Sequence, residues 1–303
     1  MGAAALLHGT LTRMTTKNSN PTSHAHPHAQ PHLHPLDQAL ALTSSHAGQY
    51  HGSTHPGYWN MVGPFGGITA ATALQAVLQH PDLLGEPLSL TVNFAAAQVA
   101  GAFTVQAVPV RTNRSTQHWT VAFFQPDAQG HPVVTTTATA VTAVRRDTWS
   151  LGDVPLPSVP QPTALARTTP AMGVEWLQRY DMRPVTGTLP ERWEGQGDSS
   201  LTQLWMRDDP PRPLDFCALA ALADVFFPRV WLRRALRVPA GTVSLTVYFH
   251  ANAQELAATG TGYLLGQARG QEFRNGFFDQ TVQLWNEAGA LLATSHQMVY
   301  FKE

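Results

Sequence analysis

One segment of this 303-residue chain occurs twice, and this repetition restricts the fold more than any other feature. Residues 89–94 read SLTVNF and residues 244–249 read SLTVYF, so the two copies lie 155 positions apart. Further along, DAQG at 127–130 corresponds to NEAG at 286–289, and apolar residues follow each at a separation of 159. An internal duplication explains both matches, and loop insertions account for the drift of four positions.

Each half also contains a helical segment that is apolar on nearly every side. Residues 67–80 carry no Asp, Glu, Lys or Arg, and residues 216–227 carry one charged side chain, that of Asp224. A helix of this kind must be buried on most sides. Alternating polar and apolar residues indicate strands at 103–108, 118–121 and 281–285. Together the patterns predict an α+β fold in which an antiparallel sheet wraps round one buried helix, twice along the chain.

Composition divides the chain into four parts. Residues 1–36 contain a His-rich, low-complexity stretch without apolar periodicity, which predicts a disordered tail. Its histidines suit adventitious metal binding at most, because their spacing matches no closed metal site. Five prolines between residues 149 and 172 predict a linker. The two predicted repeats therefore cover residues 37–148 and 173–303.

The charge balance excludes several classes of partner. Nineteen basic and twenty acidic side chains give a net charge of −1, so the chain lacks the basic surface that nucleic acids or anionic membranes attract. No apolar stretch reaches the length of a membrane span, and the first residues do not resemble a secretion signal, so we expect a cytoplasmic location. The single cysteine, Cys217, excludes an intrachain disulfide and a multi-cysteine metal site, and we interpret it as a core residue.

Four motifs resemble, in their order along the chain, those of the acyl-CoA thioesterase II family. They are PFGG at 64–67, LADVFFP at 222–228, GTVSLTVYFH at 241–250 and GALLATSHQ at 289–297. The similarity covers about residues 40–303 and implies a double hot-dog fold, that is, two tandem hot-dog repeats. It also implies a thioester hydrolase of lipid metabolism, which converts a fatty acyl-CoA to a free acid and coenzyme A without a metal or redox cofactor.

The family places an Asp, a Thr and a Gln of the second repeat around the hydrolytic water. By motif, these roles fall on Asp224, Thr242 and Gln297. Two departures accompany them: His296 replaces an apolar residue, and the stretch after His250 lacks an Arg-Pro continuation that bears on how the acyl or pantetheine part is held. The sequence itself also favours a functional role for Asp224, because burying a carboxylate in an apolar helix costs free energy unless it is hydrogen-bonded or serves in the chemistry. The alternative is a structural Asp that caps a helix or faces solvent.

The first repeat offers an internal comparison for these three residues. The repeat offsets and an alignment of the two helices match them with Ala73, Pro87 and Ala138. None of these side chains can orient or deprotonate water. We therefore expect one active site per chain.

Glycine and arginine residues are candidates for binding the substrate. Gly66 and Gly67 open the first helix, where free backbone amides suit a developing oxyanion, although a tight turn explains them equally well. Arg111 and Arg114 are candidates for the phosphates of coenzyme A, with exposure to solvent as the alternative. The same two interpretations apply to four arginines near the second helix, Arg229, Arg233, Arg234 and Arg237.

Two other functions fit the same fold. A hydratase or dehydratase would need a His and acid pair, and HPG at 55–57 offers His55, although a turn explains this motif better. A non-catalytic acyl-binding protein is the second, because fold alone does not fix function. A hot-dog sheet leaves edges and one face exposed, so we also expect a homodimer or a higher homo-oligomer. The length of acyl chain that the protein accepts depends on tertiary packing, and no sequence motif indicates it.

Overall fold

The computed structural model describes residues 33–168, 173–190 and 192–303. The N-terminal repeat contains α1 (Pro35–Ala39), β1 (Thr43–His46), β2 (Gln49–Ser53), the 3-10 helix η1 (Pro56–Tyr58), α2 (Gly66–Leu78), β3 (Glu86–Phe94), β4 (Ala102–Thr112), β5 (Thr116–Pro126) and β6 (Pro132–Ala143). The remainder contains η2 (Pro162–Ala164), η3 (Glu175–Arg179), β7 (Tyr180–Thr186), β8 (Thr202–Asp208), α3 (Phe216–Leu222), α4 (Arg229–Arg234), β9 (Ala240–Phe249), α5 (Ala253–Thr259), β10 (Leu264–Arg269), β11 (Phe273–Arg274), β12 (Phe277–Asn286) and β13 (Leu291–Phe301). None of these described helices is long and apolar enough to cross a membrane.

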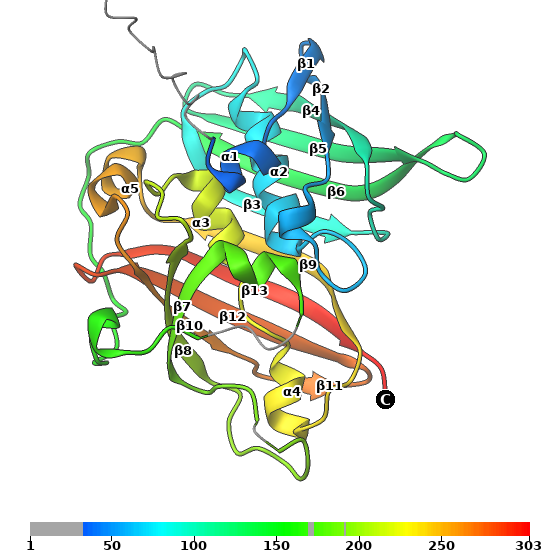
Figure 1. The fold of residues 1–303 in the computed structure, drawn as a ribbon. Helices are drawn as coiled ribbons and strands as arrows, with labels where there is room; N and C mark the ends of the chain where they lie inside the picture. The colour runs from blue at the N-terminus through cyan, green and yellow to red at the C-terminus, as the bar shows by residue number, and fades with distance from the viewer. Residues whose placement is uncertain (1–32, 169–172, 191) are drawn as a thin grey trace, which may run out of the picture. The chain divides into compact units, whose positions relative to one another are not determined.

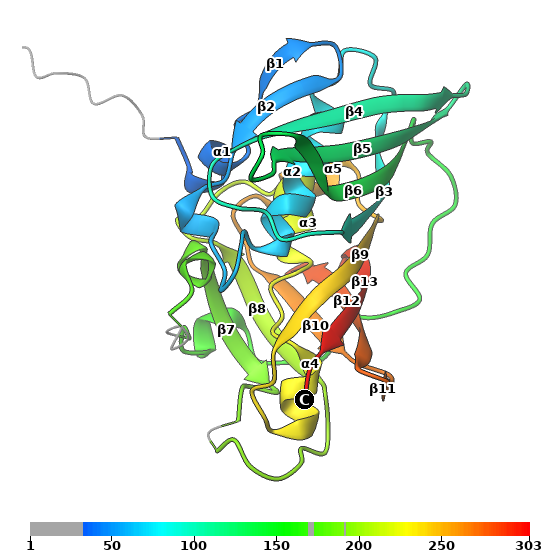
Figure 2. The ribbon, with the colours of Figure 1, turned by 90° about the vertical axis from the view of Figure 1, so that its right-hand side faces the viewer.

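The strands form one antiparallel sheet that runs through both repeats (Figure 1). Its order is β1-β2-β4-β5-β6-β3-β9-β13-β12-β10-β8-β7, and β11 pairs with β12 off this path. The first six strands of this order, which end with β3, belong to the N-terminal repeat. The six that begin with β9 belong to the C-terminal repeat, so β3 and β9 form the junction. Figure 2 shows them side by side. The arrangement agrees with the predicted α+β fold of two sheet-and-helix units.

At the junction, the two copies of the duplicated strand, β3 and β9, pair with each other. Thr91 lies directly opposite Thr246, its partner in the duplication, and their Oγ1 atoms are 3.0 Å apart. On one side of this pair Ser89 faces Tyr248, and on the other side Asn93 faces Ser244. This exchange of positions means that a local two-fold axis relates the two repeats here. The duplication seen in the sequence is therefore a structural symmetry.

The register corrects one match that was drawn from the sequence. Gln297 on β13 lies opposite Leu245, and the copy of Leu245 in the first repeat, Leu90, lies opposite Ala140. Ala140, and not Ala138, is thus the counterpart of Gln297. Strands β5 and β6 are each longer than their counterparts β12 and β13. The separation of 159 positions, which was counted at the hairpin turns, therefore does not apply within the strands. The comparison keeps its meaning, because both positions are alanine.

Two central helices form the core of the repeats. Helix α2 buries ten of its 13 residues and α3 buries all seven, as their apolar sequences predict. The helices pack against each other, and Gly67 permits the close approach: a Cβ atom there would lie 2.6 Å from the carbonyl oxygen of Ala221. Their N-termini differ. Asp215 caps α3 by accepting a hydrogen bond from the Ala218 amide at 2.8 Å, whereas the residue that precedes α2 makes no such side-chain cap with the described residues.

The described part of the chain begins at residue 33, before the predicted end of the tail at residue 36. Residues 1–32, which include most of the His-rich stretch, lie outside the described residues. Helix α1 starts at Pro35, and Leu36 is fully buried in the core, so residues 33–36 do not belong to a disordered tail. Arg212 anchors the helix by donating to Asp37 Oδ1 at 2.7 Å, and it also bonds to Asp215. Local composition does not reveal this anchor, because Arg212 lies 175 positions away from Asp37.

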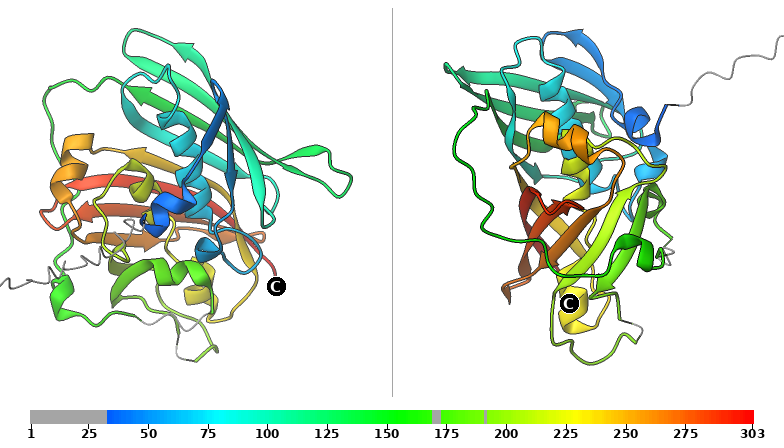
Figure 3. Two further views of the ribbon diagram at one scale, coloured as in Figure 1. Left: turned by 45° about the horizontal axis from the view of Figure 1, so that its top comes forward. Right: turned by 90° about the vertical axis from the view of Figure 1, so that its left-hand side faces the viewer.

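The predicted linker covers the outside of the C-terminal repeat. The chain that follows β6 crosses the strands of this repeat before it reaches η2 (Figure 3, right). The indole N–H groups of Trp205 and Trp285 donate to the carbonyl oxygens of Pro160 and Val154, at 2.8 and 3.2 Å. Leu156, Val159 and Leu165 also pack against the cluster that contains Trp205, so residues 154–165 contact the C-terminal repeat and are not a free spacer.

Candidate active site

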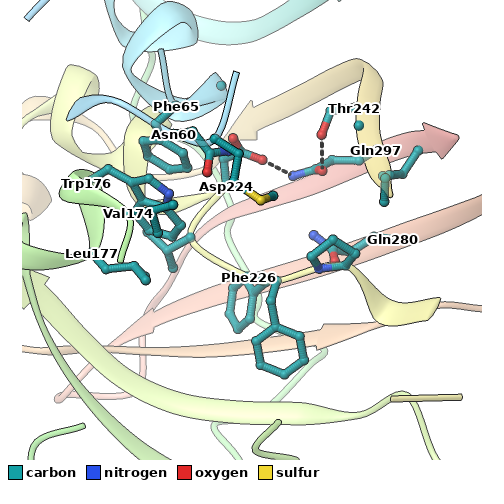
Figure 4. Close-up of a pocket in the computed structure, with 18 of the residues that line it drawn as sticks. Asn60, Phe65, Val174, Trp176, Leu177, Asp224, Phe226, Thr242, Gln280 and Gln297 are labelled. Atoms are coloured by element: carbon teal, nitrogen blue, oxygen red, sulfur yellow. Dashed lines mark hydrogen bonds between the residues drawn. The ribbon is translucent and has the colours of Figure 1, made fainter. Parts of the chain in front are cut away.

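The three side chains predicted to act on water are joined by hydrogen bonds (Figure 4). Asp224 follows α3, Thr242 lies on β9, and Gln297 lies on the neighbouring strand β13. Gln297 Nε2 donates to Asp224 Oδ1 at 2.6 Å, and Thr242 Oγ1 donates to Gln297 Oε1 at 3.4 Å. The threonine thereby fixes the orientation of the glutamine amide, which presents its N–H to the carboxylate.

The carboxyl group of Asp224 is largely removed from water. The residue is 9% exposed, and burial raises the pKa of its carboxyl group to about 7. The Gln297 side chain and the Gly67 backbone amide both donate to this group and act in the opposite direction. A carboxyl group with a pKa near neutrality is suited to accept and return a proton at pH 7. The alternative of a solvent-facing Asp is excluded. The alternative of a helix-capping Asp stays open, because Asp224 accepts a hydrogen bond from the Gly67 amide at the N-terminus of α2.

Both glycines that open α2 lie against this carboxyl group. The Gly67 amide donates to it, and a Cβ atom at Gly66 would lie 2.7 Å from Asp224 Oδ2. Because α2 and Asp224 belong to different repeats, the site requires both. The role of the two glycines toward the substrate stays a prediction.

A cavity of about 760 Å³ opens beside Asp224. Residues of both repeats line it, and its walls are mainly apolar; Figure 4 shows Phe65, Trp176 and Phe226 among them. Among the described residues, Asp224 is the one charged side chain in the lining. A cavity of this kind suits an apolar chain whose reactive group lies at Asp224.

Two protein-family models match the chain. Residues 55–143 match the acyl-CoA thioesterase N-terminal domain, and residues 153–301 match the acyl-CoA thioesterase C-terminal domain. The chain belongs to the acyl-CoA thioesterase family. The predicted enzyme class, a thioester hydrolase, is thereby confirmed.

Solved structures resemble this thioesterase over most of its length. A conserved protein of unknown function with a hot dog fold from Alicyclobacillus acidocaldarius is 48% identical, with a TM-score of 0.83 over 89% of this chain and 98% of that chain. A putative thioesterase II from Thermobifida fusca YX is 20% identical, with a TM-score of 0.73 over 88% and 97%. An acyl-CoA thioesterase II from Mycobacterium marinum is 19% identical, with a TM-score of 0.68 over 88% and 98%. The double hot-dog fold is confirmed, and a search of curated proteins gave no match.

Four arginines that are candidates for binding the phosphates of coenzyme A, or for exposure to solvent, lie outside the cavity lining of the thioesterase. Arg111 and Arg114 lie at the turn between β4 and β5, where Arg111 Nε donates to Asn113 Oδ1 at 3.1 Å. Arg233 and Arg234 end α4 and border a second cavity. The structure therefore does not bring these side chains to Asp224.

Three further candidates have other roles in the structure. Arg229 is fully buried, so the interpretation of a solvent-exposed side chain is wrong, and its guanidinium is not available to a phosphate at the surface. Arg237 lies 5.8 Å from the centre of the Trp231 ring and does not line the cavity. His55 caps η1, where its Nδ1 accepts a hydrogen bond from the Gly57 amide, as the turn interpretation predicts. The described lining contains no histidine that could form a pair with Asp224.

Gln280 is a cavity residue that no motif indicated. It lies on β12 opposite Gln297, is 1% exposed and lines the cavity. Along this strand it takes an inward position of the kind that Phe278, Val282 and Leu284 fill with apolar side chains. A polar residue at an inward position of an alternating strand is the sequence signal that could have identified it.

Proposed function

We propose that this enzyme hydrolyses fatty acyl-CoA thioesters to a free acid and coenzyme A, with the attacking water held by Asp224, Thr242 and Gln297. The observation that carries the proposal is the buried carboxyl group of Asp224 at the wall of an apolar cavity, bonded to Gln297 and through it to Thr242. An acyl chain is the kind of ligand that such a cavity accommodates.

In the proposed reaction, the ionised Asp224 takes a proton from water while the water oxygen attacks the carbonyl carbon of the thioester. Gln297, oriented by Thr242, keeps the carboxylate and the water in place. The backbone amide of Gly66, at the positive end of the α2 dipole, stabilises the oxyanion that forms, while the Gly67 amide stays bonded to Asp224. The carbon–sulfur bond then breaks, and the protonated Asp224 returns its proton to the leaving thiolate.

A thiol-release assay over acyl-CoAs of increasing chain length tests the proposal. We expect free coenzyme A and free acid in equal amounts. Hydration of a double bond without thiol release, as a hydratase would give, would contradict the proposal. Binding without turnover, as an acyl-binding protein would give, would contradict it too.

The hydrolysis rate should rise with pH through an ionisation near 7. The ionised form of Asp224 is the active base, and burial raises the pKa of its carboxyl group to about 7. The value of kcat/KM, measured between pH 5 and 9, should therefore increase about tenfold per pH unit well below this pKa and level off above it. A rate that does not change between about pH 5 and 8 would argue against Asp224 as the base.

Asp208 provides a matched control for this profile. Burial also raises the pKa of Asp208 to about 7, and the residue does not line the cavity. The Asp208→Asn variant should keep the inflection of the rate profile, whereas Asp224→Asn should remove it together with most of the activity.

We also propose that the chains associate into a homodimer or a higher homo-oligomer. The outer face of the C-terminal repeat exposes Tyr248, Met298 and Tyr300, and exposed apolar patches commonly mark contacts with another chain. Strands β1 and β7 end the sheet of the described residues without a further partner. Sedimentation at low micromolar concentration should show a species heavier than one chain, and a single species with the mass of one chain would contradict the association.

A further inference from the structure

A buried arginine lies behind one wall of the cavity. Arg229 is fully buried, and no described carboxylate forms an ion pair with it. Its guanidinium donates to neutral acceptors: the carbonyl oxygens of Phe227 at 3.0 Å and Ser200 at 3.2 Å, the hydroxyl of Thr202 at 2.6 Å and the amide oxygen of Gln280 at 3.0 Å. A buried cation is costly to a fold, and here its hydrogen bonds fix the groups around it.

Arg229 determines how the side-chain amide of Gln280 is turned. A guanidinium has only donors, so the amide oxygen must face Arg229 and the Nε2 group must face the other way. Gln280 is 1% exposed and lines the cavity, and no described residue accepts a hydrogen bond from its Nε2. Gln297 differs, because Asp224 and Thr242 bond to both of its polar ends.

The unpaired N–H of Gln280 lies on the side of Gln297 away from Thr242. Strand β13 lies between β9 and β12, so Thr242 and Gln280 flank Gln297 on opposite sides. Figure 4 shows Gln280 in the cavity wall with Phe226 nearby. Val299, on β13, adds another apolar side chain to the lining. An amide N–H in such a wall is a donor directed at whatever fills the apolar part of the cavity.

We propose that Gln280 is a specificity residue that donates a hydrogen bond to an oxygen atom, keto or hydroxyl, on the acyl chain of the substrate. This inference rests on the thioesterase function proposed above. A plain alkyl chain that fills the cavity would leave a buried donor unpaired, which is costly. A site built to bond a polar group of its substrate discriminates strongly against an analogue that lacks the group, and we expect a preference of at least about tenfold here.

Substrates of equal chain length test the preference in the wild-type protein. The probes are acyl-CoAs that carry no oxygen, a keto oxygen or a hydroxyl group on the chain, with the oxygen near the thioester or near the chain end. At least one oxygenated probe should be hydrolysed with a kcat/KM about tenfold or more above that of the plain chain. Equal values for all probes would overturn the proposal.

Gln280→Met removes the donor while keeping the length of the side chain. Arg229 Nε also donates to the carbonyl oxygen of Phe227, so it retains a partner in this variant. The preference for oxygenated chains should disappear, and hydrolysis of the plain chain should continue. Gln283→Met is the matched control, because Gln283 lies on the opposite face of β12, where it accepts a hydrogen bond from Gln267, and this variant should keep the preference.

Gln280→Glu is the second variant, for use if melting shows that the Met variant does not fold. Its carboxylate still accepts from Arg229 but offers no donor, so the keto probe should lose its advantage. Slowing of plain and oxygenated chains by one common factor would place Gln280 at the thioester and overturn the proposal.

Failure of the proposed function would be a separate result. If no acyl-CoA is hydrolysed, the thioesterase proposal fails, and calorimetric dissociation constants of the same probes still test Gln280. A tenfold tighter binding of an oxygenated probe would support its role, and equal binding of all probes would overturn it.

Discussion

The Asp224→Asn variant is expected to hydrolyse acyl-CoA at least about 100-fold more slowly than the wild type, because general-base contributions amount to about 10²–10⁴-fold. The amide is nearly isosteric with the carboxyl group, but it cannot take a proton from water. Its oxygen can still accept the hydrogen bond that Gln297 Nε2 donates to Asp224 Oδ1. The measurement is kcat for one acyl-CoA at about pH 8, where the wild-type carboxyl group is ionised.

The same substitution should not destabilise the fold at this pH. Burial raises the pKa of Asp224 in the folded state to about 7, above its value in an unfolded chain. The contribution of this group to the free energy of unfolding is therefore complete below about pH 4 and is lost as the pH rises through 7. Asn carries no charge that must be desolvated, so the variant should melt no lower than the wild type at about pH 8. Wild-type turnover with unchanged melting would show that Asp224 is structural.

Substitutions around Asp224 provide the controls. Gln297→Ala and Thr242→Ala should slow hydrolysis less than Asp224→Asn, because these side chains position the base and the water without taking the proton. Ala140→Ser, at the counterpart of Gln297 in the other repeat, should change the rate only modestly.

Gly66→Ala is expected to lower the hydrolysis rate about 100-fold with little loss of stability. The new Cβ atom would lie 2.7 Å from Asp224 Oδ2, so the carboxylate would have to move away from its position beside Gln297. A misplacement of about 1 Å can cost about 100-fold in rate. Alanine also reduces the freedom of the unfolded chain, which offsets part of the crowding. Turnover and melting temperature are measured on the same preparation.

The neighbouring variant, Gly67→Ala, should differ from Gly66→Ala by a clear loss of stability. Its Cβ atom would lie 2.6 Å from the carbonyl oxygen of Ala221, which belongs to the backbone of α3 and cannot rotate away. Overpacking of this kind costs about 1–3 kcal/mol, so the melting temperature should fall clearly. If the two glycine variants change rate and melting to the same extent, the two positions do not have the separate roles that we infer.

The internal duplication is what made the sheet predictable. Two copies of one strand, each beside an apolar helix, indicated a repeated unit, and Thr91 and Thr246 meet at the symmetry position of that unit. Asp224 was also accessible from sequence, because it is the one charge in the apolar segment 216–227. The helix predicted over that segment ends at Leu222, so Asp224 follows it and does not belong to it. In both cases the informative residues lie close together along the chain, so a local pattern contains them.

The surroundings of Arg229 were not predictable in the same way. Its acceptors come from the segment before β8, from β8 itself and from β12, and only the tertiary structure brings these together. Without those partners, Arg229 is indistinguishable from a surface arginine that could bind a phosphate. Leu36 shows the same limit, since a His- and Pro-rich neighbourhood hides a residue that the core fully buries.

The N-termini of α2 and α3, the corresponding helices of the two repeats, have different surroundings. At the start of α2, the backbone meets Asp224, a residue of the other repeat. At the start of α3, Asp215 accepts a hydrogen bond from the Ala218 amide and forms an ion pair with Arg212, which also donates to Asp37 in α1. The first N-terminus thus lies in the candidate active site, and the second connects α1 to α3 through Arg212. Each of these two helix N-termini thus lies against an aspartate, and at α2 that aspartate comes from the other repeat.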